Sequence, residues 1–241
     1  MAVAPTSAGG ASGWRGFPWL PAILAFLLGG LAVGLLYHFD LFGGSSRSTV
    51  GSGVAASQVR HLPAFDGVEL AGSNDVLVRI GGRQSVVVRA DDNLLARVTT
   101  EVRGRSLVIG NTRGSFTAKS PMSVEVTVPA LAALTLAGSG NITVDGVDTQ
   151  SLTVSLPGSG TLSGSGNARR LEVTVGGSGT VQFTELVARN VRAVVSGSGS
   201  IFVTATASLD ASVTGTGSIL YAGSPRNVTK SVTGTGAIVG S

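Results

Sequence analysis

Cysteine is absent from the chain, and charged and aromatic side chains are scarce. Without a thiol there is no disulfide framework, no thiolate metal site, no cysteine nucleophile and no lipid-modified cysteine. Charged residues make up 12% of the chain and aromatic residues 5%, and the Lys and Arg residues are scattered. A nucleic-acid-binding protein gathers basic residues on one face and uses aromatic rings for stacking, so we expect no nucleic-acid partner.

Histidine is also rare, since only His38 and His61 occur in 241 residues. His38 falls at the end of an apolar segment and His61 in a linker or a first strand. Neither is expected to join a catalytic triad or a metal cluster. No loop carries the Gly-Lys-Ser/Thr pattern that holds phosphates. The sequence therefore predicts no cofactor, no metal site and no catalytic residue.

Glycine is abundant, with 36 residues, and 43% of the chain is hydrophobic. This composition is too apolar for a disordered chain. Glycine combined with Val, Ile, Leu, Ser and Thr is typical of strands joined by tight turns. We therefore expect an all-β domain.

One long apolar segment lies near the N-terminus. Residues 17–39 contain no charged side chain, and a helix needs about 20 apolar residues to cross a bilayer. The alternative, a cleaved signal peptide, has a shorter apolar core followed by small residues, whereas bulky residues follow this one. We expect a transmembrane signal-anchor helix over 17–39, although the sequence leaves cleavage open.

The charges beside this helix predict its orientation. Arg15 and the terminal amine lie before it and Asp40 after it, so the positive-inside rule puts residues 1–16 in the cytoplasm. The rest of the chain would then lie outside, in the periplasm or at the cell surface. Residues 40–61 are mostly small and polar and are expected to form a flexible linker. Residues 62–241 show strand patterns throughout.

The second half of the chain contains an internal repeat. A Gly-Ser-Gly or Gly-Thr-Gly triplet recurs at spacings of 20, 19, 20, 18 and 19 residues. The triplets begin at Gly138, Gly158, Gly177, Gly197, Gly215 and Gly234. A fixed period of this length indicates a solenoid.

Apolar residues recur at even distances from each triplet, such as Leu156 two residues before Gly158 and Leu162 four residues after it. Residues two apart share one face of a strand, so each repeat has one apolar face and both glycines are expected to point inward. Stacked repeats would bury these columns continuously. We therefore predict a parallel β-helix, or β-solenoid, with turns of about 19 residues. A sandwich of hairpins would not keep the columns aligned.

Upstream segments and the triplets together resemble a known family. The segments are Phe65-Asp66-Gly67-Val68, the run from Ala90 to Leu95, and Thr100-Glu101-Val102. Over roughly residues 62–240 the chain is similar to the head GIN domain of putative auto-transporter adhesins. The resemblance implies a bacterial cell-envelope protein with a β-helical fold, and it carries over no catalytic residue. Members are often lipoproteins or secreted, and this chain differs in having no Cys and a predicted membrane helix.

Two sets of outward residues are candidates for binding. The middle residue of every triplet carries a hydroxyl, which predicts a stripe along the solenoid that hydrogen-bonds a partner or only keeps the surface wet. Its members are Ser139, Ser159, Ser178, Ser198, Thr216 and Thr235. Arg169 and Arg189, each eight residues before a triplet, would add a basic patch for an acidic polysaccharide.

Polysaccharide-active β-helices carry several carboxylates on consecutive turns. Here Glu172, Arg192 and Asp210 are expected to stack with alternating sign, as an exposed ion ladder. The leading function is therefore a non-enzymatic, adhesion-like binding module. A structural or sensory envelope protein that binds another protein is the second hypothesis, and a polysaccharide-active enzyme the third.

The ends of the solenoid bear on self-association. Lys230 interrupts an apolar column in the last repeat, and a charge at a strand edge discourages pairing with another chain. We expect this repeat to act as a cap, which leaves homo-oligomers to form through the opposite end, near residues 62–80. The expected partners are thus the membrane through residues 17–39, a glycan or envelope protein, and a second copy.

Overall fold

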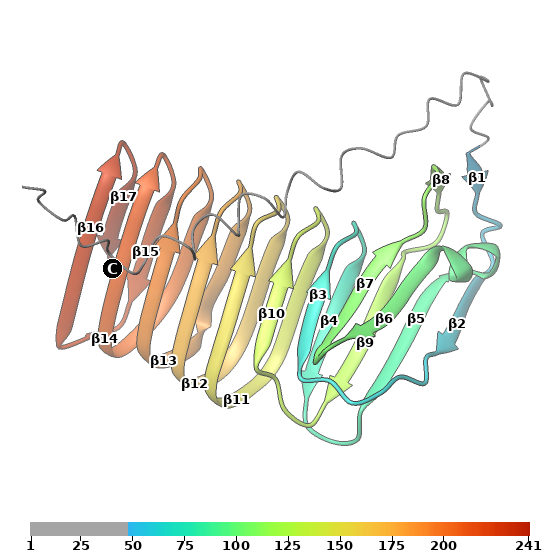
Figure 1. Ribbon diagram of the computed structural model, residues 1–241, viewed down its shortest axis with the longest axis horizontal. Helices are drawn as coiled ribbons and strands as arrows, with labels where there is room; N and C mark the ends of the chain where they lie inside the picture. Colours follow the sequence, from blue (N-terminus) through green and yellow to red (C-terminus); the bar gives the residue numbers. More distant parts are fainter. Residues whose placement is uncertain (1–47) are drawn as a thin grey trace, which may run out of the picture. The chain divides into compact units, whose positions relative to one another are not determined.

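The computed structural model describes residues 48–241 (Figure 1). The predicted cytoplasmic segment 1–16, the membrane helix 17–39 and the first part of the linker lie outside the described residues. Within residues 48–241, no helix is both long and apolar enough to span a bilayer. The described chain is almost entirely strand.

The repeat folds as predicted, into parallel coils stacked along one axis. Each strand pairs with the equivalent strand of the next coil: Asn141 faces Thr161, Thr161 faces Thr180, and Thr180 faces Ser200. These offsets equal the spacings of the glycine triplets. The strands of this part are β10 (Ala133–Leu136), β11 (Asn141–Leu156), β12 (Thr161–Val175), β13 (Thr180–Val195), β14 (Ser200–Gly215), β15 (Ser218–Ala222), β16 (Asn227–Gly234) and β17 (Ala237–Gly240).

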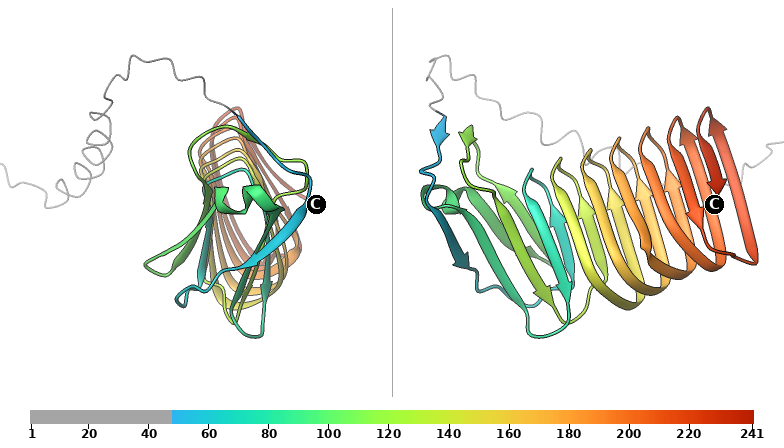
Figure 2. Two further views of the ribbon diagram at one scale, coloured as in Figure 1. Left: turned by 90° about the vertical axis from the view of Figure 1, so that its right-hand side faces the viewer. Right: turned by 180° about the vertical axis from the view of Figure 1, so that it is seen from behind.

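Each coil is flattened, with two long sides and two narrow edges (Figure 2). The glycine triplet turns the chain at one edge. At the other edge the long strands bend and their register shifts, as between Val144 and Val147 of β11. The two halves of β11 to β14 therefore belong to opposite sides of the solenoid.

The predicted apolar columns form its core. Leu156 and Leu162 are fully buried, as are the equivalent side chains of most coils. The last coil differs, because Val232 is 46% exposed and Lys230 is exposed. Full burial of an aliphatic side chain contributes about 1.5–3 kcal/mol, so the repeated columns hold the coils together.

The triplet glycines are needed for close stacking, and here the prediction needs a correction. The second glycine is buried, and a Cβ on Gly160 would lie within 3.0 Å of Leu136 and of the backbone of Gly140. The first glycine is partly exposed, and a Cβ on Gly158 would meet the backbone of the preceding coil. Only the second glycine therefore points inward, and both are required because the preceding coil lies so close.

The N-terminal part continues both sides of the solenoid and then changes to antiparallel pairing. On one side β3 pairs with β7 in parallel and β7 with β6 antiparallel; on the other, β4 pairs with β9 in parallel, and β9–β5 and β5–β2 are antiparallel. A separate parallel pair joins β1 and β8. The elements are β1 (Thr49–Val50), β2 (Ala55–Val59), β3 (Gly67–Leu70), β4 (Asp75–Ile80), β5 (Ser85–Asp91), the 3-10 helix η1 (Asp92–Arg97), β6 (Val98–Arg103), β7 (Ser106–Asn111), β8 (Phe116–Thr117) and β9 (Ser123–Val128).

Two expectations about this region are wrong. Residues 55–59, part of the predicted flexible linker, form strand β2 on the edge of the sheet. Residues 62–80 are not an open end, because β3 and β4 each have a neighbour on both sides. They are interior strands because β5, β6 and η1 extend the structure beyond them.

The opposite end is the open one. Strands β16 and β17 each pair on one side only. Lys230 places its Nζ over the ring of Tyr221, 4.7 Å from the centroid, and it leaves Val228 and Val232 exposed. Lys230 is therefore a charge on an open edge and does not cover the core.

Candidate functional site

The structure separates the two predicted sets of binding residues. The hydroxyl residues lie at the glycine edge of the coils, between the end of one side and the start of the next. Arg169 and Arg189 lie at the bent edge, about half a coil away along the chain. The two sets are on opposite narrow edges, so no single surface includes both.

The hydroxyl stripe is exposed along its whole length, as expected from its position. Its backbone N–H groups are engaged with the preceding coil: the N–H of Ser159 donates to the carbonyl of Gly138, and that of Ser198 to Gly177. The Thr216 hydroxyl donates to the Ser198 hydroxyl at 3.1 Å. The stripe thus offers small hydroxyls on a flat edge with no charged group.

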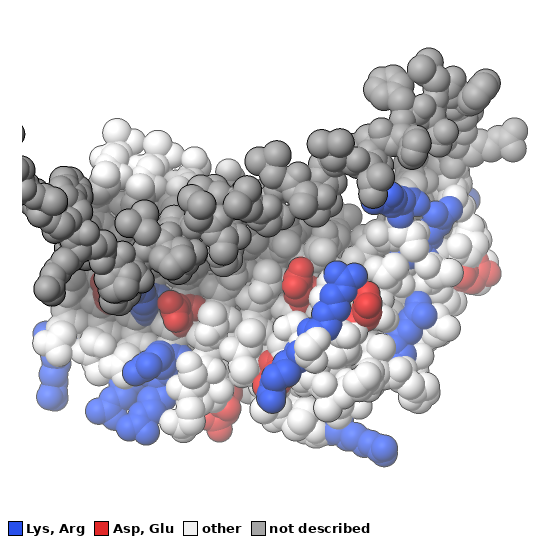
Figure 3. Space-filling model, viewed as in Figure 1, with Lys and Arg blue, Asp and Glu red and all other residues white. Residues whose placement is uncertain are grey.

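The two arginines of the bent edge are neighbours. Ala168 pairs with Ala188 and Arg170 with Asn190, so Arg169 stands directly beside Arg189 on adjacent strands, which are about 4.8 Å apart. Both are exposed and line one shallow depression of about 460 Å³. Figure 3 shows blue side chains gathered along the lower edge of the solenoid, below β12 and β13.

Polar side chains surround these arginines. The depression is also lined by Asp148, Gln150, Asn167 and Thr206. Gln150 stands beside Arg169 on the preceding coil, because its two chain neighbours pair with the neighbours of Arg169. Amides and a hydroxyl next to two guanidinium groups are the donors and acceptors that a glycan carrying acidic groups requires.

Neither Arg169 nor Arg189 is neutralised. Within residues 48–241, no carboxylate oxygen lies within 4.0 Å of either guanidinium group. Two like charges about 5 Å apart in water repel each other by roughly 1 kcal/mol. This repulsion disfavours the folded state slightly, and an anion held between the two groups would remove it.

Other arginines show the contrast. Arg192 lies 2.9 Å from Asp210 and 3.9 Å from Glu172, which confirms the predicted ion ladder. Because these carboxylates share one arginine between them, they are a surface ion network and do not form an acid–base pair. Further pairs join Arg89 to Glu125, Arg103 to Glu101 and Arg105 to Asp66.

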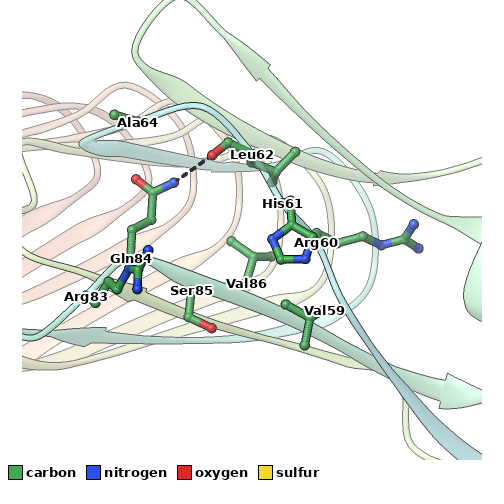
Figure 4. Close-up of a pocket in the computed structure, with 9 residues that line it drawn as sticks. All are labelled: Val59, Arg60, His61, Leu62, Ala64, Arg83, Gln84, Ser85 and Val86. Carbon is green, nitrogen blue, oxygen red and sulfur yellow. Dashed lines mark hydrogen bonds between the residues drawn. The ribbon is translucent and has the colours of Figure 1, made fainter.

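The largest depression of the described surface, about 760 Å³, lies beside β2 and β5 at the N-terminal end (Figure 4). It contains His61, which is exposed, and Arg83. The amide of Gln84 donates to the carbonyl of Leu62 at 3.2 Å, and the guanidinium of Arg60 points away from it. No carboxylate lines this depression, so His61 has no partner there for acid–base catalysis.

Two shifted carboxyl groups in the described chain have structural causes. The hydroxyl of Ser120 and the N–H groups of Lys119, Ser120 and Gly53 hold the pKa of buried Asp91 below its ordinary value. The Arg105 guanidinium lowers the pKa of Asp66. Among residues 48–241, no three His, Asp or Glu residues lie close enough to hold a metal ion. Both shifted groups therefore belong to the framework of the N-terminal end.

Stacked parallel coils with an unpaired basic edge define a β-solenoid repeat domain. The model of the family described as putative auto-transporter adhesin, head GIN domain, matches residues 64–225. The chain belongs to this family, as its sequence features suggested. A search of curated proteins finds no match.

Solved structures share the fold. A putative adhesin from Bacteroides fragilis is 22% identical, with a TM-score of 0.68, over 80% of this chain and 100% of that one. A putative lipid binding protein from Parabacteroides distasonis is 21% identical, with a TM-score of 0.50, over 81% of this chain and 100% of that one. The proteins are described as adhesins or binding proteins and not as enzymes, which is consistent with a non-catalytic, adhesion-like module.

Proposed function

We propose that this chain is an extracytoplasmic, adhesion-like module that binds an acidic glycan and is held at the membrane by residues 17–39. The observation that carries the proposal is the pair Arg169 and Arg189. They are exposed, stand one strand apart and have no carboxylate partner among the described residues. The family description and the name of the B. fragilis protein support an adhesive role.

The rigid coils make this edge suitable for binding. The backbone on either side of each arginine is hydrogen-bonded to the neighbouring coil, so the spacing of the two guanidinium groups is fixed before a ligand arrives. A ligand carboxylate or sulfate would accept charge-assisted hydrogen bonds from both groups. Pre-organisation of this kind lowers the entropic cost of binding.

A glycan array that contains acidic and neutral glycans tests the proposal. We expect the protein to bind acidic glycans, and the double variant Arg169→Ala/Arg189→Ala to bind them at least tenfold more weakly, since charge-assisted hydrogen bonds contribute about 1.5–3 kcal/mol each. The matched control, Arg83→Ala/Arg113→Ala, removes two exposed charges elsewhere. Binding to neutral glycans only, or an equal loss in the control, would refute the proposal.

The open end supports a second candidate function, the recognition of another envelope protein. Strands β16 and β17 have an unpaired edge in the described chain, and Val228, Val232 and Val239 are exposed there. An added strand could pair with such an edge. A photocrosslinking residue at Val239 would then capture a protein in cells, while one at Val50, exposed at the other end, would not. Equal crosslinking at both positions argues against this function.

A further inference from the structure

The basic edge is longer than the two arginines that the sequence indicated. Arg226 lies eight residues before the triplet at Gly234, at the same offset as Arg169 and Arg189. Its backbone N–H donates to the carbonyl of Ala207, and the next residues, Asn227 and Ser208, are paired. Arg226 is therefore on the same edge, two coils beyond Arg189.

The members of this edge share an exposed position and the lack of a carboxylate within 4.0 Å among residues 48–241. The intervening coil has Ala207 at the same offset. Its short side chain cannot block a ligand that passes from Arg189 to Arg226. Arg170, next to Arg169 in the chain, widens the basic surface at the other end. The edge is defined by Arg169, Arg170, Arg189 and Arg226 and is here called the arginine edge.

We infer that the arginine edge binds a linear, carboxylated polysaccharide that lies along the solenoid axis, across the strands. This inference rests on the proposed function and specifies its ligand. Strand spacing is about 4.8 Å, so Arg169 and Arg189 are one step apart and Arg226 is two steps further, about 10 Å. A single anion reaches one or two of these groups, whereas a chain with regularly repeated anionic groups reaches all of them.

The neighbouring side chains favour a glycan over a nucleic acid. Gln150, Asn167 and Thr206 line the depression beside the arginines, and such side chains hydrogen-bond the hydroxyl groups of sugars. No aromatic residue lines it, although proteins that bind single-stranded nucleic acids stack bases on aromatic rings. Charge and lining together therefore select a hydroxyl-rich polyanion.

Oligogalacturonates of increasing length are the probe, measured by calorimetry with the whole described domain and its variants. We expect affinity to rise with length until the oligomer spans Arg169 to Arg226. Arg226→Ala should weaken long oligomers about fivefold and leave the shortest binding oligomer unchanged. The exposed Arg113→Ala is the control, and circular dichroism should show the same fold in every variant.

The outcomes separate the two proposals. If Arg169→Ala/Arg189→Ala abolishes binding but Arg226→Ala has no effect on long oligomers, the axial ligand is refuted and the proposed function stands. If neither variant changes binding, both fail. Equal affinity for a single-stranded oligonucleotide of similar charge would overturn the assignment to a polysaccharide.

Discussion

The two ends of the solenoid are built differently. At the C-terminal end, parallel coils simply stop, and the last coil exposes Val228 and Val232. At the N-terminal end, antiparallel strands and η1 cover the coils, and Leu94 of η1 is fully buried. The repeat needs only glycine corners and apolar columns, because each coil is a template for the next. The N-terminal end needs individual contacts, and the buried carboxylate of Asp91 is the clearest of them.

The largest expected effect comes from breaking the coil-to-coil contact. Gly160→Val should destabilise the domain by at least about 3 kcal/mol, because the new side chain would overlap the backbone of Gly140 and the side chain of Leu136. Gly176→Ala is the control, since a Cβ there has no neighbour closer than 3.9 Å. Urea unfolding measures both, and equal midpoints would show that the coils are not this close.

The core columns should weaken toward the open end. Leu156→Ala leaves a cavity in a fully buried column and should cost about 2–5 kcal/mol. Val232→Ala, in the exposed last coil, should cost less than about 1 kcal/mol. The same unfolding experiment compares them. Similar losses at the two positions would mean that the last coil is covered by another part of the protein.

The N-terminal end should respond to acid before the repeat does. The pKa of Asp91 is lowered by its hydrogen bonds, so its contribution to stability is present above its unfolded pKa of about 3.9 and is lost as the pH falls through the folded pKa.

Hydrogen exchange follows the three amides that donate to Asp91, those of Gly53, Lys119 and Ser120. Asp91→Asn at pH 7 should expose them as acid does, while Val173 in the repeat stays protected. Unchanged protection of the three amides in the variant would rule out this role.

The smallest effects should distinguish the two kinds of surface arginine. Arg192→Ala breaks the contacts with Glu172 and Asp210 and should cost about 0.5 kcal/mol, less at high salt. Arg169→Ala removes a like-charge neighbour of Arg189 and should be neutral or slightly stabilising. Thermal unfolding at low and high salt separates them. A clear loss for Arg169→Ala would reveal a structural partner that the unpaired edge lacks.

The sequence predicted most of the repeat, because triplet spacing and strand register are the same quantity in a parallel solenoid. The alternation of Glu172, Arg192 and Asp210 followed from the same offsets. Arg226 could have been found in this way too, since it has the offset of Arg169 and Arg189. The separation of the arginines from the hydroxyl stripe was also present in the offsets, because nine residues are about half of a coil.

The N-terminal end was harder to predict for a physical reason. Residues 55–59 of β2 are small or polar and mostly exposed, and what holds them is backbone pairing with β5, which leaves no side-chain pattern. Asp91 resembles a turn residue in sequence, and only the fold brings Gly53 and Ser120 to its carboxylate. Long-range contacts between single residues have no periodicity from which to predict them.

The most direct test of the account is the distance between nitroxide labels at Gln150→Cys and Arg226→Cys, the two ends of the column that contains Arg169 and Arg189. The chain has no cysteine of its own, so the labels are specific. Four strand steps of about 4.8 Å predict a single distance near 20 Å. A broad distribution, or a distance far from four strand steps, would contradict the stacked arginine edge.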